Sequence, residues 1–213
     1  MTTYALELSA LMAIFFFVII SPGADLAMVM RQSIVYGRRS AIVTSLGIGI
    51  SLLFHVGYTI LGLGLIISQS ILLFNIVKWC GVAYLVYIGI RSLRAGTTAM
   101  VEPKARTPRE QPRQPVLKAF ALGFAANALN PKPVFFFLSI FANVVSLSTP
   151  PAVKFGYGVV MAICLVTWFV GVSYFMTTPR MRAAFSRASK WIDRASGVVF
   201  IALGIKLATQ KAG

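Results

Sequence analysis

The sequence predicts an all-α integral membrane protein with six transmembrane helices, arranged as two inverted repeats of three helices. The 213 residues are 58% hydrophobic and 12% charged, whereas a soluble domain is about half apolar and about a quarter charged. Apolar runs of roughly 20 residues, which are long enough to cross a bilayer as helices, recur along the chain. Two of these runs are broken at proline, one in each half of the chain, as in many secondary transporters with inverted repeats.

The first and fourth predicted spans are long helices with a break near the middle. The first is expected to break at Ser21-Pro22-Gly23 and the fourth at Asn130-Pro131. The sixth has a short apolar centre crowded by charges such as Asp193 and Lys206, and we expect these side chains to reach the membrane interfaces by snorkelling. The predicted spans are residues 4–36, 41–67, 72–93, 116–146, 153–177 and 191–209.

The two halves of the chain share a second feature besides the breaks. The third span closes with Tyr84-Leu-Val-Tyr-Ile-Gly-Ile-Arg91, and the sixth closes with Val199-Phe-Ile-Ala-Leu-Gly-Ile-Lys206. Because a unit of three spans is odd, its duplicate must insert with the opposite topology. The repeats would occupy residues 1–93 and 116–213. Residues 94–115, rich in Pro, Arg and Thr, are predicted to be a basic loop between them.

Most of the 20 Lys and Arg residues fall in alternate connections, after the first, third and fifth spans. Cytoplasmic loops carry such an excess, so these connections are predicted to face the cytoplasm and both termini the periplasmic or extracellular side. This placement also accounts for the net charge of +15 without nucleic acid, because the cations stand in blocks with no interleaved aromatic residues.

Each break contains residues with which helices commonly begin. Ser or Asn followed by Pro is typical of an N-cap with Pro at the first helical position. We therefore expect one half-helix to start at Ser21-Pro22 and another at Asn130-Pro131. Their N-termini would meet near the midplane, where unpaired N–H groups favour an anionic group and Gly23 leaves the backbone accessible. The alternative is that the prolines only kink two long helices.

One charge follows each break. Asp25, one of five acidic residues, lies well inside an apolar segment, and Lys132 takes the same place after the second break. Charges at such depth are costly and mark functional sites. Asp25 would hold a substrate ammonium or cycle a proton, while Lys132 and the helix ends would hold a carboxylate. The site would therefore suit an amino-acid zwitterion. The structural alternative is that Asp25 and Lys132 pair with each other, or that Asp25 only complements its helix dipole.

Two further polar residues are candidates for the site. His55 is the only histidine and lies within the second span. It could relay protons, or it could make a single hydrogen bond between helices, which is the commoner role. Asn127 precedes Asn130 by three residues, so both share a helix face if the helix persists. Asn127 would then add a polar group to the cavity or join two helices.

The sequence shows no enzyme signature. It has no HExxH, metal-ligand cluster, Gly-rich phosphate loop or Walker lysine pattern, so no catalytic residue, metal or cofactor is expected. A passive channel for small metabolites is the main alternative to a transporter. An intramembrane enzyme would need more polar groups, and a membrane scaffold would not need both Asp25 and Lys132.

The two motifs together resemble those of the LysE family of amino-acid exporters, which includes threonine and homoserine efflux proteins. The similarity covers Ser21-Pro-Gly-Ala-Asp25, Lys78-Trp-Cys-Gly-Val-Ala-Tyr-Leu-Val-Tyr-Ile-Gly89 and Asn130-Pro-Lys132. The family usually has a second proline where Ala24 stands, a departure that eases the rigidity of the break. The resemblance implies proton-driven export of amino acids or similar small molecules across a bacterial inner membrane. A homodimer is compatible with so small a transporter.

Overall fold

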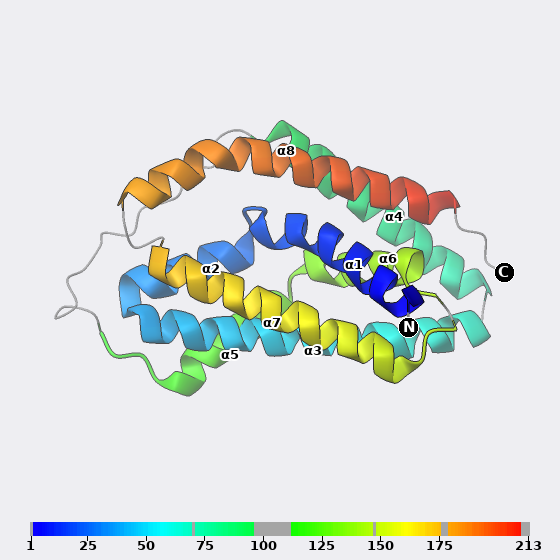
Figure 1. Ribbon diagram of the computed structural model, residues 1–213, viewed down its shortest axis with the longest axis horizontal. Coiled ribbons are helices and arrows are strands. Elements are labelled where there is room, and N and C mark those ends of the chain that lie inside the picture. The colour runs from blue at the N-terminus through cyan, green and yellow to red at the C-terminus, as the bar shows by residue number, and fades with distance from the viewer. Residues whose placement is uncertain (1, 70, 96–111, 147, 176–178, 210–213) are drawn as a thin grey trace.

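The computed structural model describes residues 2–69, 71–95, 112–146, 148–175 and 179–209, and within these ranges all regular structure is helical. Figure 1 shows the helices in chain order. Their bounds are α1 Thr2–Ile20, α2 Ala24–Tyr36, α3 Arg38–Gln69, α4 Ile71–Arg94, α5 Val116–Ala128, α6 Pro131–Val144, α7 Pro151–Phe175 and α8 Pro179–Thr209.

Both predicted breaks are confirmed. Residues 21–23 separate α1 from α2, and residues 129–130 separate α5 from α6, so each long span consists of two helices. The last helix is longer than the span predicted at residues 191–209, because α8 begins at Pro179. Residues 180–194 are rich in Arg, Ala and Lys, which are good helix formers even though they are not apolar. The helix therefore continues beyond the apolar stretch that identified it.

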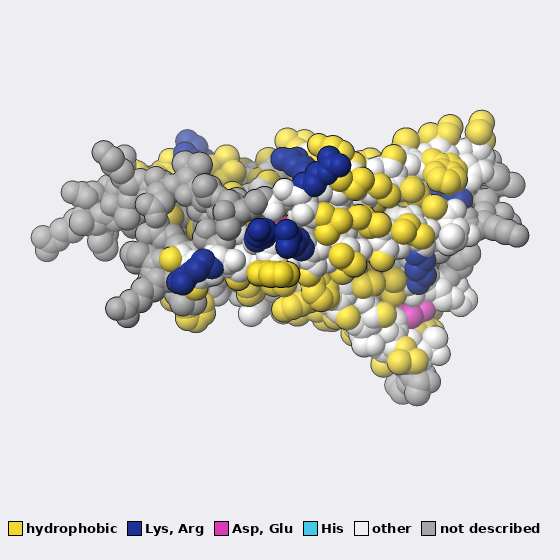
Figure 2. All heavy atoms as spheres, turned by 90° about the horizontal axis from the view of Figure 1, so that it is seen from above, with side chains coloured by type: hydrophobic (Ala, Val, Ile, Leu, Met, Phe, Trp, Pro, Cys, Tyr) yellow, Lys and Arg dark blue, Asp and Glu magenta, His cyan; other side chains and the backbone are white. Residues whose placement is uncertain are grey.

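Three helices contain a stretch that is long and apolar enough to cross a membrane: Thr3–Ile20, Arg38–Gly62 and Pro151–Phe175. The half-helices α5 and α6 are apolar but shorter. Large apolar side chains stand outside the protein, among them Leu6 at 69% exposure and Ile163 at 61%. In Figure 2, which looks down on α4 and α8, hydrophobic side chains cover much of the face, interrupted by groups of basic residues. Such a surface fits contact with lipid, and the chain is a membrane protein.

The helices form two layers, with one half of each broken span between them. Helices α4 and α8 lie side by side in one layer, while α2, α3, α5 and α7 make up the other (Figure 1). Helices α1 and α6 lie between the layers, and both reach α8. The start of α1 and the end of α8 lie at the same end of the molecule, and the α2–α3 junction lies at the other. This arrangement brings the two breaks into the interior.

Helix α5 is held directly against α3 through two glycines. A Cβ added to Gly47 would collide with the carbonyl oxygen of Phe120, and one added to Gly123 would collide with the carbonyl oxygen of Thr44. The Thr44 hydroxyl donates to the Ala119 carbonyl at 3.0 Å across the same contact. The two backbones touch. The contact therefore fixes the position of α5, and of the break that follows it, along α3.

Replacing Gly123 by alanine is expected to destabilise the protein by about 1–3 kcal/mol, because the clash is with backbone that cannot rotate away. Gly57→Ala on α3 is the matched control, since a Cβ there meets nothing within 4 Å. Thermal unfolding of the detergent-purified variants measures the difference. Equal midpoints for the two variants would contradict the close contact.

Candidate functional site

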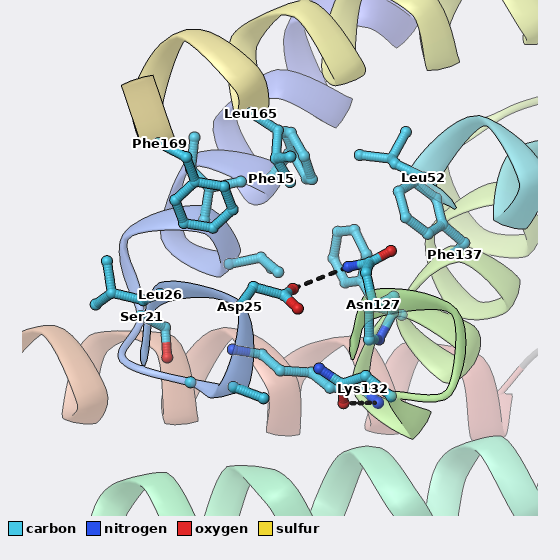
Figure 3. A pocket seen from close by; sticks show the side chains of 17 residues that line it. Phe15, Ser21, Asp25, Leu26, Leu52, Asn127, Lys132, Phe137, Leu165 and Phe169 are labelled. Carbon is cyan, nitrogen blue, oxygen red and sulfur yellow. Dashed lines mark hydrogen bonds between the residues drawn. The ribbon is translucent and has the colours of Figure 1, made fainter. Parts of the chain in front are cut away.

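Both breaks line a single cavity of about 40 Å³ in the interior (Figure 3). The apolar walls come from α1, α3, α6 and α7, and include Phe15, Leu52, Phe136 and Phe169. The polar groups come from the breaks and the turns beside them. They are Ser21, Asp25, Asn127, Asn130 and Lys132, five of the residues predicted from sequence. Segments more than 100 residues apart therefore meet at one point, since Asn127 bonds Asp25 across a separation of 102 residues.

The first break differs from its predicted geometry. Gly23 is the N-cap of α2, with extended backbone angles and no side-chain capping bond, so Pro22 lies outside the helix. Ser21 is therefore not the N-cap that we expected. Its buried hydroxyl instead lies 3.5 Å from Asp193 Oδ1, to which it donates. The N-terminus of α2 keeps its first N–H groups free of side-chain caps, because Ser21 is used elsewhere.

The second break has the predicted geometry. Asn130 is the N-cap of α6 and its side chain accepts from the backbone N–H of Lys132 at 3.0 Å, with Pro131 at the first helical position. The cap fixes the first turn of α6. The Lys132 side chain consequently starts from a rigid position at the edge of the cavity (Figure 3).

Asp25 and Asn127 join the two breaks. Asn127 Nδ2 donates to Asp25 Oδ2 at 2.8 Å (Figure 3). The remaining oxygens, Asp25 Oδ1 and Asn127 Oδ1, are both buried and have no hydrogen-bond partner within the described part of the chain. Buried acceptors without a partner are rare and costly. The pair therefore offers two unfilled acceptor positions beside the cavity.

Lys132 reaches from the second break towards the first. Its Nζ would lie 3.8 Å from a Cβ added to Gly23, and it lies 5.3 Å from the ring centroid of Phe200 on α8. Two carboxylates, Asp25 and Asp193, attract this ammonium. Asp25 Oδ1 nevertheless has no hydrogen-bond partner among the described residues. Even if Asp25 and Lys132 attract each other, one oxygen of the Asp25 carboxylate remains without a hydrogen-bond donor.

Asp193 is a residue of this site that the sequence reasoning missed. Snorkelling was expected for it, but the side chain is only 5% exposed and faces the first break, where it accepts from Ser21. It lies on the packed face of α8, in line with Ser189, Ser196 and Phe200, all of them buried. That spacing of three and four residues marks a helix face turned to the interior. This row of small and apolar residues is the sequence pattern from which the burial of Asp193 could have been predicted.

His55 lies beside the site and does not line the cavity. It is 1% exposed, with Nδ1 at 2.7 Å from the Tyr58 hydroxyl and Nε2 at 3.2 Å from the Asn127 carbonyl oxygen. Its ring also stacks on Phe137. These contacts supply the hydrogen bond between helices that was one of the two expected roles. The relay role stays a prediction.

The third carboxylate of the described chain, Glu7 on α1, is separate from the cavity. It accepts from the backbone N–H of Ser146, from the Thr149 hydroxyl and from the Tyr157 hydroxyl, each at 3.0 Å. Glu7 therefore holds the start of α1 against the segment that joins α6 to α7. Both carboxylate oxygens of Glu7 have hydrogen-bond donors in the protein, whereas Asp25 Oδ1 has none among the described residues.

Comparison with a family model identifies a translocator family, and comparison with known proteins identifies efflux proteins among the relatives. Residues 16–211 match the family described as "LysE type translocator". The "Threonine efflux protein" of Salmonella typhi is 30% identical over 189 residues, which cover 89% of this chain and 91% of that protein. The "Homoserine/homoserine lactone efflux protein" of Salmonella typhimurium is 28% identical over 195 residues, covering 90% and 91%. No solved structure matches the chain.

Proposed function

Since the chain belongs to the LysE type translocator family, we propose that it is a secondary transporter that exports amino acids or close derivatives across a bacterial inner membrane in exchange for protons. The names of the threonine and homoserine efflux relatives support amino acids as the solute class. The observation that carries the proposal is the placement of unfilled acceptors and a lysine ammonium around one cavity between the breaks.

The polar groups of the cavity match the two ends of a zwitterion. A substrate ammonium has three N–H donors, and Asp25 Oδ1 and Asn127 Oδ1 are two buried acceptors without partners in the described chain. Lys132 offers a positive charge to the substrate carboxylate. The N-terminus of α2, which has no side-chain cap, offers backbone N–H groups to the same end. Amino-acid substrates would thus be bound at both ends.

The charges around the cavity provide a reason for proton exchange. Asp25 and Asp193 bring two negative charges against the single positive charge of Lys132. A zwitterion has no net charge, so its release leaves the excess negative charge of the site in place and takes the ammonium away from the buried Asp25 carboxylate. A proton bound from the outer side would neutralise it. Competition between ammonium and proton for the same carboxylate would couple export to the proton gradient.

The cavity must enlarge for transport. Its 40 Å³ is room for about one water molecule, so an amino acid needs helices to move apart. Of the three long apolar stretches, that of α1 is the least buried inside the protein, at 17%, against 39% for α7 and 61% for α3. We expect the α1–α2 unit to move against the α3–α5 pair. In the proposed inverted-repeat plan, residues 1–93 and 116–213 each contribute one break to the cavity, and both termini face the periplasm.

Transport by the purified protein in liposomes tests the proposal. Liposomes are loaded with labelled amino acids, beginning with threonine and homoserine, and efflux is followed with and without an acidic outer buffer. We expect the inward proton gradient to accelerate efflux and a protonophore to abolish the acceleration. Efflux that follows the solute gradient alone would indicate the passive channel instead.

A further inference from the structure

A second cavity, of about 430 Å³, lies at the end of the molecule away from the start of α1. It is formed by the end of α2, the start of α3 and the residues just before α5, a region that the charge distribution predicts to be cytoplasmic. Its volume falls in the range of about 300–1,000 Å³ that is typical of small-molecule sites. The polar side chains that line it are Tyr36, Arg39, Ser40, Arg113 and Gln114.

The two guanidinium groups of this cavity have no counter-charge among the described residues. The described carboxylates are Glu7, Asp25 and Asp193, and each lines or bonds a different part of the molecule. The other two acidic residues of the chain lie outside the described ranges. Arg39 and Arg113 therefore present ten N–H donors in rigid forks that suit an oxyanion such as a carboxylate.

One face of α2 connects the two cavities. Asp25 lines the central cavity and Tyr36 lines the second one, and at 100° per residue the two lie within about 20° of each other around the helix. Gln32 lies on the same face between them. It is fully buried, and neither atom of its amide has a hydrogen-bond partner in the part of the chain that the structure describes.

The amide of Gln32 is costly where it lies. A buried polar group without a partner lowers stability, and an apolar residue of similar size would avoid the loss. The amide has a use if a polar solute passes along this face of α2, because it can then donate to a carboxylate and accept from an ammonium. The unpaired amide is thus an independent indication of a polar route between the cavities.

We propose that the second cavity is a receiving site for the carboxylate of the exported amino acid, from which the solute moves along α2, past Gln32, to the central cavity. The inference rests on the proposed function and adds to it the place and chemistry of cytoplasmic entry. Arg39 and Arg113 bind the carboxylate first, and Lys132 takes it over in the central cavity.

The double variant R39Q/R113Q tests the receiving site in liposomes of the full-length protein. The concentration dependence of transport is measured from the cytoplasmic face, with threonine and with the amino alcohol that lacks its carboxylate. We expect the half-saturating concentration of threonine to rise roughly tenfold, as the loss of charge-assisted hydrogen bonds requires. That of the amino alcohol should stay unchanged.

Arg38→Gln is the control for loss of a nearby positive charge, because it removes one guanidinium at the residue next to Arg39. The Arg38 guanidinium is held 4.9 Å over the ring of Tyr174 and does not line the cavity. An unchanged affinity in the double variant, or equal loss for threonine and its amino alcohol, overturns the receiving site. If the double variant fails to insert, R39Q and R113Q are measured singly. If the wild-type protein moves no amino acid, the proposed function fails instead.

An anionic lipid headgroup is the other source of an oxyanion at this place. The measurements are therefore repeated in phosphatidylcholine alone and with added phosphatidylglycerol. An effect of R39Q/R113Q that appears only with phosphatidylglycerol assigns the cavity to lipid and overturns the proposal. Gln32→Leu completes the test, since it should slow transport while leaving the thermal midpoint equal or higher. Unaltered transport in Gln32→Leu removes the route along α2.

Discussion

Asp25→Asn is expected to insert normally and to lose amino-acid export. Asparagine has nearly the same shape, and its side-chain oxygen can still accept the bond that Asn127 donates at 2.8 Å. The change removes the negative charge that faces the cavity and the proton-binding group. Removing one member of a buried charge pair costs about 2–5 kcal/mol, so we expect the rate of export to fall on the order of a hundredfold or more.

The matched control is Glu7→Gln, which makes the same carboxylate-to-amide change on α1. The partners of Glu7 lie in the segment before α7 and on α7 itself, and Glu7 does not line the cavity. Glu7→Gln should therefore keep transport, with some loss of stability. Export at the wild-type rate by Asp25→Asn under an imposed pH gradient would exclude both roles proposed for Asp25.

Solute exchange distinguishes the two roles of Asp25. With the same amino acid on both sides of the membrane, labelled solute can exchange without net proton movement. If Asp25 only carries the proton, Asp25→Asn should lose gradient-driven export and keep exchange. If the carboxylate also holds the substrate ammonium, both activities should be lost. The geometry favours the second outcome, because Asp25 Oδ1 is a buried acceptor with no partner among the described residues.

The sequence was sufficient to locate the two breaks because proline leaves a local signature. Pro131 after Asn130 gives both the helix start and its cap, and the structure has both. The same rule failed at the first break, where Ser21 has the right identity and spacing for an N-cap. A tertiary partner, Asp193, takes its hydroxyl instead. Local propensity thus predicts where a helix begins better than it predicts which side chain caps it.

The contacts that assemble the site were not predictable from local rules. Asp193 lies in a stretch rich in basic residues, and the low hydropathy of this stretch predicts a solvated or snorkelling helix end. Its burial depends on the stripe of Ser189, Ser196 and Phe200 that packs against the rest of the protein. Gln32 carried no signal at all, because one polar residue on a half-helix is unremarkable until its burial is known. Both residues required the packing of helices that are distant in sequence.

Lys132→Met is expected to raise the half-saturating concentration of carboxylate-bearing substrates roughly a hundredfold, as expected for loss of a direct ion pair in the cavity. Amino alcohols, which lack the carboxylate, should be transported with nearly unchanged affinity. Lys206→Met is the control for charge removal, because Lys206 is exposed at the end of α8. The half-saturating concentrations of amino acids and amino alcohols are measured for both variants by concentration-dependent efflux from liposomes. Equal loss of affinity for amino acids and amino alcohols would make Lys132 a structural residue.

The charges around Lys132 predict a second, separable effect on stability. Without its ammonium, the buried carboxylates of Asp25 and Asp193 both lose the cation that attracts them, so Lys132→Met should also lower the thermal midpoint. Adding Asp193→Asn removes one of the two negative charges and should restore stability, with a coupling of about 0.5–3 kcal/mol. The double variant should remain unable to bind the carboxylate tightly. Stability and carboxylate affinity that recover together would mean that Lys132 acts only by neutralising Asp193.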